Sequence, residues 1–378
     1  MLIHGTARCT RRERIGLKAT LLLEDGSEWT GELFGGSAPA AGEVVFNTGM
    51  VGYPESLTDP SYSGQILLLT YPLVGNYGVP RSRGNGAGEL VPSPFESERI
   101  HARGLVVADY SRHYSHWRAE ESLHAWLERE GVPGLTGIDT RALTRRLRHH
   151  GTMLGRVVPA GGEGPEPEGV PEAPVPLVSV SEPTLIGAGG PRVGLIDCGA
   201  KAGIVRSLLQ RGASVLRVPW DHDLTAEKVD GVMISNGPGD PKQCLATVEN
   251  VRQLIERGNV PVFGICLGNQ IMALAAGADT YKLKFGHRGQ NQPCMRVGSR
   301  RCHITSQNHG YAVDDHTLPD GWEPWFFNAN DGTNEGIRHR DKPLRSVQFH
   351  PEARPGPVDT DFLFDEFVSM LDGKGVTG

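Results

Sequence analysis

The sequence lacks long hydrophobic runs, paired cysteines and an excess of positive charge. Its longest apolar runs, such as ILLL at 66–69, have the length of a strand, whereas a membrane-spanning helix needs about 18 or more apolar residues in a row. The formal net charge of -6 argues against a general nucleic-acid-binding protein, because phosphate binding normally requires an excess of Lys and Arg. We therefore expect neither a membrane nor a nucleic acid among the partners, and a small molecule or a protein instead.

The cysteines are few and scattered, with no CxxC pair, and nothing in the sequence is similar to a secretory signal. This pattern indicates reduced thiols in a cytoplasmic protein, and it argues against a disulfide framework or a zinc site. We accordingly expect no metal site. The six cysteines are Cys9, Cys198, Cys244, Cys266, Cys294 and Cys302.

Composition divides the 378 residues into two domains. Residues 157–190 are crowded with Pro, Gly and Glu and carry no periodic apolar residues, so we expect a linker that cannot bury enough surface to fold. Residues 1–17 are predicted to be a disordered tail, although their basic, acid-poor composition would also fit a transit peptide or an over-long gene start. The predicted domains are 18–156 and 191–378.

The first domain is predicted to be mixed α/β. KATLLLEDGSEWTGELFG, from residue 18, has two strand-like runs around Asp25 and Gly26, which favour a tight hairpin turn. GEVVF, QILLLTY and GLVVADY are further strand candidates. RAEESLHAWLEREG and DTRALTRRLRHHG have helical spacing, and the second opens with a cap signal at Asp139 and Thr140 and closes with Gly151.

The second domain alternates between apolar strands and amphipathic helices, and each of the helices is closed by Gly: RVGLID, KAGIVRSLLQRG, SVLRVP, VDGVMIS, QCLATVENVRQLIERG, VPVFGI and GNQIMALAAG. Such alternation predicts parallel strands joined by helical crossovers, and hence a doubly wound, mostly parallel sheet. In such sheets ligands bind beyond the carboxyl ends of the strands.

Cys266 follows one of these strands, in NVPVFGICLGNQ. Gly264 and Gly268 flank it, and a helix is expected to begin near Leu267, so the pattern is the cysteine analogue of a nucleophile elbow. A thiolate there would be stabilised by the N-terminus of the helix. The alternative is a packed core cysteine, which is common for a lone Cys.

Two other loops favour the nucleophile. In SVQFHPEA, His350 and Glu352 are two residues apart in an extended segment, so the carboxylate can orient the imidazole as a general base. In SNGPGDP, at 235–241, glycines after a strand can present backbone N–H groups to a developing oxyanion, together with the N–H of Leu267. Three such features at successive strand ends indicate an active site.

GICLGNQ and the later HPE resemble the class I glutamine amidotransferases. SNGPGDP, KFGHRGQNQP, SQNHGYAV and FHPEARPGP, with GEVVFNTGMVGYPESLTDPSYSGQILLLTYPLVGNYG and GIDTRALTRRLR in the first domain, resemble the small subunits of carbamoyl phosphate synthetases. The resemblance implies that Cys266 attacks the glutamine amide, His350 transfers protons and Glu352 orients His350. It implies glutamine contacts from Ser61, Gly237, Gly239, Leu267, Gln270, Asn308, Gly310 and Tyr311.

The resemblance further implies that the ammonia passes to a separate large subunit, which would use ATP and bicarbonate to make carbamoyl phosphate for arginine and pyrimidine synthesis. No cofactor is then expected in this chain, because ATP and Mg²⁺ belong to the large subunit. A rival hypothesis is an amidotransferase-fold module that has lost its chemistry and only regulates a partner.

Four positions depart from the family pattern. Asn269 stands where GHQ has His, Cys198 and Gly203 stand in DCGAKAGI where DFGAKRNI is expected, and Tyr311 replaces a more usual Phe. None of them belongs to the predicted triad, and we expect little loss of function from Asn269 or Tyr311.

Overall fold

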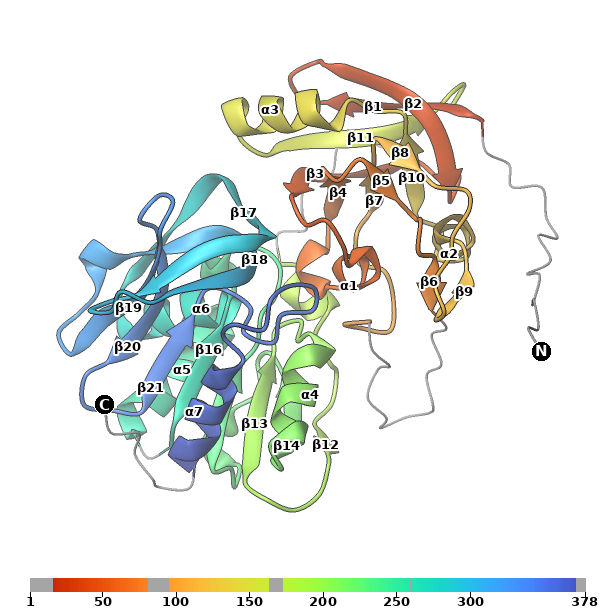
Figure 1. Ribbon diagram of the computed structural model, residues 1–378. Helices are drawn as coiled ribbons and strands as arrows, with labels where there is room; N and C mark the ends of the chain where they lie inside the picture. Colours follow the sequence, from red (N-terminus) through yellow and green to blue (C-terminus); the bar gives the residue numbers. More distant parts are fainter. Residues whose placement is uncertain (1–15, 81–94, 163–172, 259, 372–378) are drawn as a thin grey trace.

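The structure is a computed structural model that describes residues 16–80, 95–162, 173–258 and 260–371 (Figure 1). These residues form two α/β units, an N-terminal closed barrel and a C-terminal open sheet. The two units contact each other directly, for example through the hydrogen bond from the Thr48 amide to the Arg288 carbonyl (3.2 Å).

The N-terminal barrel contains both antiparallel and parallel pairs of strands. The predicted hairpin is confirmed, because its two strands pair antiparallel around Asp25 and Gly26, and Gly26 has φ 82. Round the barrel the order is β1 (Lys18–Leu23), β11 (Met153–Pro159), β3 (Ala40–Asn47), β4 (Gln65–Leu69), β7 (Gly104–Val106), β10 (Pro133–Thr136) and β2 (Glu28–Gly35).

The remaining elements of this unit cover the barrel. Helix α3 (Thr140–His150) begins as predicted, with the Asp139 side chain accepting from the Ala142 amide (2.8 Å), and it packs Leu143 and Leu147 into the barrel core. The other elements are α1 (Tyr53–Leu57), η1 (Pro60–Tyr62), α2 (Leu123–Arg129), and the strand pairs β5 (Leu73–Val74) with β8 (Asp109–Tyr110) and β6 (Val79–Pro80) with β9 (Ala119–Glu121).

The C-terminal unit is built on one sheet of ten strands. Its pairs are parallel from β14 to β21 and antiparallel at both ends. In order the strands are β12 (Thr184–Ile186), β14 (Ser214–Pro219), β13 (Arg192–Asp197), β15 (Gly231–Ile234), β16 (Val262–Ile265), β21 (Leu344–Val347), β20 (Asn334–His339), β19 (Trp322–Asn328), β17 (Asp279–Arg296) and β18 (Cys302–Asp314).

The expectation of a mostly parallel sheet was therefore wrong for half of this sheet. Between β17 and β21 no α-helix separates the strands, and the pairs that these strands form with one another are all antiparallel. The parallel half agrees with the predicted alternation of strands and helices.

Helices cover both faces of the parallel half, as expected for a doubly wound sheet. Helices α5 (Leu245–Arg257) and α6 (Leu267–Ala276) contribute to one hydrophobic core, and α4 (Ala202–Gln210) and α7 (Phe362–Leu371) to another. The short 3-10 helices are η2 (Val175–Leu177), η3 (Leu224–Ala226), η4 (Pro241–Gln243) and η5 (Asp315–Thr317).

The segment predicted as a linker, 157–190, in fact contributes to both sheets. Strand β11 continues to Pro159, and β12 pairs antiparallel with β14 at the edge of the C-terminal sheet. Residues 163–172, like residues 1–15 of the predicted tail, lie outside the described residues. No helix in the described part of the chain is long and apolar enough to cross a membrane.

Candidate active site

Cys266 lies in the sharp turn between β16 and α6, with φ 55 and ψ -103. A positive φ is unfavourable for a residue with a Cβ, and such conformations concentrate at functional sites. The turn has no room for side chains on either side: a Cβ on Gly264 would lie 2.5 Å from the Gly268 carbonyl oxygen, and one on Gly268 would lie 2.3 Å from that of Ile234. The elbow predicted from the sequence is present.

The Cys266 thiol is buried at the N-terminus of α6, with 2% of the residue exposed. Its backbone amide donates to the Val347 carbonyl (2.8 Å), which fixes the elbow to β21. The Sγ lies 3.6 Å from the Asn308 carbonyl oxygen and 3.7 Å from Gln348 Nε2. The thiol is thus held between α6, β18 and the end of β21.

His350 and Glu352 form a buried pair just beyond β21. The His350 amide donates to the Ser306 carbonyl (2.9 Å), and His350 Nδ1 lies 2.7 Å from Glu352 Oε1. Lys201 Nζ lies 3.0 Å from the same carboxylate oxygen and donates to the Ala353 carbonyl (2.7 Å). Lys201, Glu352 and His350 therefore form a continuous chain of charged groups.

The electrostatics of these three groups favour a charged imidazole at His350. Burial alone would lower the pKa of His350, but the Glu352 carboxylate and a thiolate at Cys266 together outweigh burial, so that the pKa rises to about 10. Burial would raise the pKa of Glu352, but Lys201 and His350 hold it down, to about 2. At neutral pH the pair is an imidazolium beside a carboxylate.

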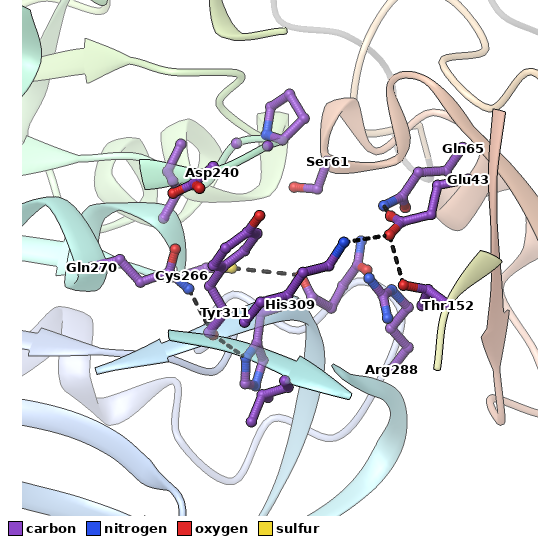
Figure 2. Close-up of a pocket in the computed structure, with 18 of the residues that line it drawn as sticks. Glu43, Ser61, Gln65, Thr152, Asp240, Cys266, Gln270, Arg288, His309 and Tyr311 are labelled. Atoms are coloured by element: carbon purple, nitrogen blue, oxygen red, sulfur yellow. Dashed lines mark hydrogen bonds and ion pairs between the residues drawn. The ribbon is translucent and has the colours of Figure 1, made fainter. Parts of the chain in front are cut away.

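Cys266 opens onto a cavity of about 230 Å³ at the junction of the two units (Figure 2). The cavity is lined by the glycine-rich loop after β15, by α6, β17 and β18, and by residues of the N-terminal unit. Every glutamine contact expected from the sequence is among the lining residues, whereas His350 and Glu352 do not line it. Those contacts are Ser61, Gly237, Gly239, Leu267, Gln270, Asn308, Gly310 and Tyr311.

The N-terminal unit is tied into this cavity by polar side chains. Asn236 Nδ2 donates to Ser61 Oγ (2.9 Å), and Asn308 Nδ2 donates to Asp59 Oδ2 (3.0 Å). The other oxygen of Asp59 accepts from the Ser61 amide (2.9 Å). Asp59 therefore positions one cavity residue from each unit.

The part of the cavity farther from Cys266 is charged (Figure 2). Glu43 Oε1 accepts from Thr152 Oγ1 (2.7 Å) and from Lys282 Nζ (3.0 Å). Burial would raise the pKa of Glu43, but Arg288 and Lys282 outweigh it and the pKa is lowered. This wall suits a polar, charged ligand.

Comparisons with known proteins cover both units. Residues 194–370 match the family model of the class-I glutamine amidotransferases, and residues 21–157 match the model named carbamoyl-phosphate synthase small chain, CPSase domain. The arginine-specific small chain of carbamoyl phosphate synthase from Saccharomyces cerevisiae is 49% identical over 94% of this chain and 89% of its own length. The corresponding small chain from Neosartorya fischeri is 49% identical over 94% of this chain and 80% of its own length. This chain belongs to the carbamoyl phosphate synthase small-chain family.

Similarity extends to larger proteins. The multifunctional protein pyr-3 of Neurospora crassa is 49% identical over 93% of this chain, but the chain spans only 21% of that protein. Against the multifunctional protein CAD of Squalus acanthias the identity is 51%, over 93% of this chain and 16% of that protein.

The departures from the small-chain family pattern have structural explanations. Asn269 is buried, donating to Gln348 Oε1 (3.1 Å) and accepting from Ser346 Oγ (2.8 Å). Tyr311 offers its backbone carbonyl to Gln270 Nε2 (2.9 Å), so its ring does not make that contact.

At the carboxyl end of β13, Cys198 is fully buried, and its amide donates to Ser235 Oγ (2.9 Å). The Gly203 amide donates to Glu96 Oε2 (2.8 Å), and a Cβ at Gly203 would lie 2.9 Å from that oxygen and 3.0 Å from Glu352 Cγ. Glycine therefore lets a buried carboxylate of the N-terminal unit approach the triad.

Two residues that organise this small-chain site were not predicted. Lys201 stands in DCGAKAGI between β13 and α4, as the N-cap residue of α4, and Asp59 stands in TDPSYS two residues before Ser61. Both stretches resemble the family pattern, but neither residue type signals a role by its spacing. A charged residue in the loop beyond the carboxyl end of a buried parallel strand was the available signal for Lys201.

Proposed function

We propose that this chain is the glutaminase subunit of a carbamoyl phosphate synthase. It hydrolyses L-glutamine to glutamate, with Cys266 as nucleophile, His350 as general acid and base, and Glu352 as the group that orients His350. The observation that carries the proposal is the Cys266 elbow, which opens onto a polar cavity and stands beside the buried His350–Glu352 pair.

In the first half of the reaction the Cys266 thiolate attacks the carbon of the glutamine side-chain amide. The tetrahedral intermediate collapses as the C–N bond breaks, and His350, an imidazolium at neutral pH, gives its proton to the departing nitrogen. Ammonia leaves, and a glutamyl thioester remains on Cys266.

In the second half, water attacks the thioester. The now neutral His350 takes a proton from the water, the C–S bond breaks, and glutamate leaves while the thiolate and imidazolium are restored. Glu352 stays ionised throughout, because its pKa lies near 2.

The oxyanion of both tetrahedral intermediates would be held by backbone N–H groups of Leu267, at the N-terminus of α6, and of the loop containing Gly237 and Gly239. The close approach of this loop supports the assignment. A Cβ on Gly237 would lie 2.1 Å from the Cys198 carbonyl oxygen and 2.8 Å from Leu267 Cδ2, so only glycine allows this backbone to lie beside Leu267. Ser61, Gln270, Asn308, Gly310 and Tyr311 would hold the amino-acid end of glutamine.

The ammonia would be used by a large partner subunit, which would bind ATP and Mg²⁺ and convert bicarbonate to carbamoyl phosphate for arginine and pyrimidine biosynthesis in the cytoplasm. The small chains from yeast and Neosartorya fischeri that this chain matches support this partner by their names. Ammonia released by a free small chain would be lost, so we expect slow hydrolysis alone and faster hydrolysis in the complex.

The test is glutamate release from glutamine by the full chain, with and without the large subunit, ATP and bicarbonate. We expect release that the partner stimulates, accompanied by carbamoyl phosphate, and its loss in Cys266→Ser. Cys302→Ser is the matched control, because Cys302 is an exposed free thiol. Activity retained in Cys266→Ser would overturn the mechanism, and release that never responds to the partner would overturn the assignment of the acceptor. No release under any condition would favour a regulatory module.

A further inference from the structure

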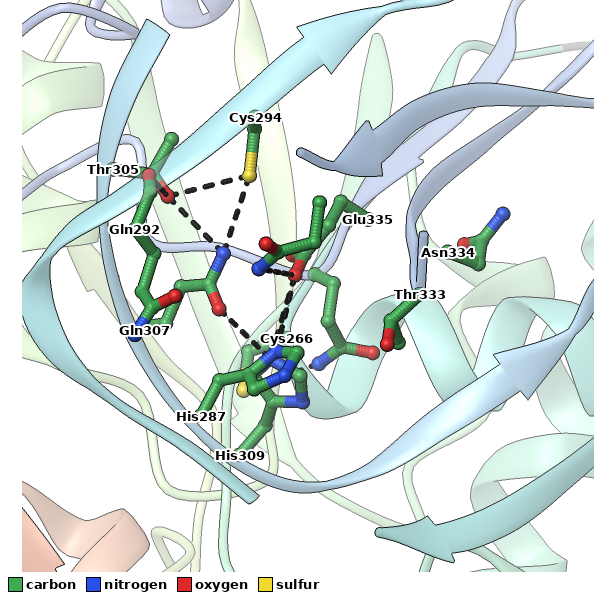
Figure 3. A network of polar contacts seen from close by, with 12 residues as sticks. Cys266, His287, Gln292, Cys294, Thr305, Gln307, His309, Thr333, Asn334 and Glu335 are labelled. Atoms are coloured by element: carbon green, nitrogen blue, oxygen red, sulfur yellow. Dashed lines mark hydrogen bonds and ion pairs between the residues drawn. The ribbon is translucent and has the colours of Figure 1, made fainter. Parts of the chain in front are cut away.

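A second cluster of ionisable side chains lies in the antiparallel half of the sheet (Figure 3). It consists of His287 on β17, His309 on β18 and Glu335 on β20, all buried. One nitrogen of each histidine and one carboxylate oxygen lie within 4.8 Å of one another. Three strands that are distant in sequence therefore bring three possible metal ligands to one point.

Each histidine has one ring nitrogen that points away from the cluster, the outward nitrogen, and one that points into it, the inward nitrogen. The contacts of the outward nitrogens show how the rings are protonated. His287 Nε2 lies 2.8 Å from Asp331 Oδ2, and His309 Nδ1 lies 2.8 Å from the Tyr311 carbonyl oxygen. A carboxylate and a carbonyl can only accept, so each outward nitrogen carries a hydrogen. In a neutral imidazole the inward nitrogen then presents a lone pair.

The inward nitrogens face other acceptors. His287 Nδ1 lies 3.3 Å and His309 Nε2 lies 3.9 Å from Glu335 Oε1, and His309 Nε2 also lies 3.2 Å from Gln307 Oε1. Asn328 Nδ2 donates to Glu335 Oε1 (3.0 Å), while Glu335 Oε2, within the described residues, is buried without a hydrogen bond. Two lone pairs and a buried carboxylate that converge in this way need either protons or a cation between them.

We propose that His287, His309 and Glu335 bind one divalent transition-metal ion, preferentially Zn²⁺. Zinc is bound by imidazole nitrogen and carboxylate oxygen at about 2.0–2.2 Å, which places tetrahedral ligand atoms roughly 3.4 Å apart. The observed separations of 3.3 and 3.9 Å from Glu335 Oε1 approach this value. A water molecule or Glu335 Oε2 would complete the coordination.

The outer contacts are those of metal-binding histidines. Such histidines usually donate their second N–H to a carboxylate or a backbone carbonyl, which fixes the ring and raises its basicity. Asp331 provides the carboxylate for His287, and Tyr311 provides the carbonyl for His309. This site was not predicted from the sequence, where no metal site was expected: His287 in KFGHRGQNQP and His309 in SQNHGYAV were noted for their family resemblance, and Glu335 is distant from both.

The ion would stiffen the wall of the active-site cavity. His309 stands between Asn308 and Gly310, which line that cavity, and the Tyr311 carbonyl that accepts from His309 also accepts from Gln270. An ion at His309 would therefore fix β18, the strand that contributes Asn308, His309, Gly310 and Tyr311 to the lining of the cavity. This coupling predicts that Zn²⁺ changes the apparent affinity for glutamine.

The test is titration of the metal-free full chain with Zn²⁺ alone by calorimetry, followed by Co²⁺ substitution and visible absorption. All variants carry Cys266→Ser, so that the Cys266 thiolate cannot bind the metal. We expect one Zn²⁺ per chain and the absorption of tetrahedral Co²⁺ without a thiolate charge-transfer band. Affinity should fall at least about tenfold in His287→Asn, in Glu335→Gln and in Asp331→Asn, whose side chain is exposed enough to leave folding intact.

His316→Asn is the matched control, because His316 is an exposed histidine next to Asp315 and should leave the affinity unchanged. Circular dichroism of each metal-free variant checks that it is folded. The proposal is overturned if the chain binds no stoichiometric Zn²⁺, or if folded Asp331→Asn and Glu335→Gln bind it as tightly as the parent. In that case protons on the histidines supply the positive charge.

Discussion

Lys201 and Glu352 form a buried ion pair that joins the N-terminus of α4 to the loop after β21. Lys201 Nζ lies 3.0 Å from Glu352 Oε1, and the two side chains are 3% and 0% exposed. The pair sets the charge and position of the group that holds His350. Its removal should therefore affect both stability and catalysis.

We expect Lys201→Met to lower the free energy of unfolding by about 3–5 kcal/mol, because it removes one of the two cations beside the buried Glu352 carboxylate. The rate of glutamine hydrolysis should fall as well, since Glu352 would lose the partner that fixes its position. Denaturant unfolding and steady-state kinetics measure the two effects. Lys242→Met is the matched control, because Lys242 pairs with Asp279 at the surface. Equal stability of the two variants would contradict the role of the pair.

Glu352→Gln should change the pH dependence of stability. The pKa of Glu352 is about 2 in the folded chain and 4.5 ordinarily, so its carboxylate stabilises the fold above pH 4.5, and this contribution is lost as the pH falls towards 2. The variant has no carboxylate at position 352 and therefore lacks this pH-dependent contribution to stability. We therefore expect its stability to fall less between about pH 5 and pH 3 than that of the wild type, as measured by urea unfolding at each pH. An equal fall in both would show that Glu352 is not held ionised.

The same substitution should lower the pKa of His350. The Glu352 carboxylate is the main group that raises this pKa against the effect of burial. Without it the imidazole would be neutral at neutral pH and could not protonate the departing nitrogen. We expect a loss of hydrolysis of about 10²–10⁴-fold. The histidine resonances of the variant, followed by NMR against pH, should show one ring that titrates at lower pH than in the wild type.

The parts of the site that the sequence predicted are those whose geometry is local. The Cys266 elbow needs only a strand, two glycines and a helix start within one short stretch, and His350 and Glu352 are two residues apart. The pairing of Lys201 with Glu352 and of Asp59 with Asn308 depends on packing between distant segments. Side-chain periodicity carries no information about such pairs.

The antiparallel half of the sheet was missed for a related reason. Strands β17 and β18 pair with irregularities between Lys282 and His287 and between Gly289 and Gln292. Each irregularity shifts the alternation of inward and outward side chains, so the period of two by which a strand is recognised is interrupted. The predicted linker was misjudged because β12 is a short edge strand with little burial.

Gly268→Ala should disrupt the elbow. A Cβ at this position would lie 2.3 Å from the Ile234 carbonyl oxygen, which is backbone and cannot move aside cheaply. We expect a loss of at least about 2 kcal/mol of stability and of most of the hydrolysis. Gly104→Ala is the control, because its nearest atom would lie 3.5 Å away, an ordinary contact. Thermal unfolding and glutamate release measure both, and a fully active Gly268→Ala would contradict the tight turn.

Asp59→Asn should weaken glutamine binding more than turnover. Asp59 holds the Asn308 amide and the Ser61 amide, and both residues line the cavity. Loss of a hydrogen bond to a charged group costs about 1.5–3 kcal/mol, so we expect KM for glutamine to rise about tenfold or more while kcat changes little. Asp109→Asn, at an exposed position on β8, is the control. A fall in kcat at constant KM would instead place Asp59 in the chemical step.

Selective labelling of Cys266 separates an active glutaminase from a silent module. Burial raises the pKa of Cys244 to about 12 and raises those of Cys198 and Cys294, so these thiols stay protonated at neutral pH and are poor nucleophiles. Cys266 instead lies at a helix N-terminus, beside His350 and open to the cavity. A diazoketone analogue of glutamine should therefore modify Cys266 first, as located by peptide mass spectrometry.

Two controls make that labelling decisive. Glutamine should protect Cys266 but not the exposed Cys302, because Cys266 lines the cavity and Cys302 does not. His350→Asn should slow the labelling of Cys266, since a neutral amide does not stabilise the thiolate as the imidazolium does. If Cys266 reacts no faster than Cys302 and glutamine gives no protection, the thiol is not activated. The His350–Glu352 pair would then serve the fold rather than the reaction.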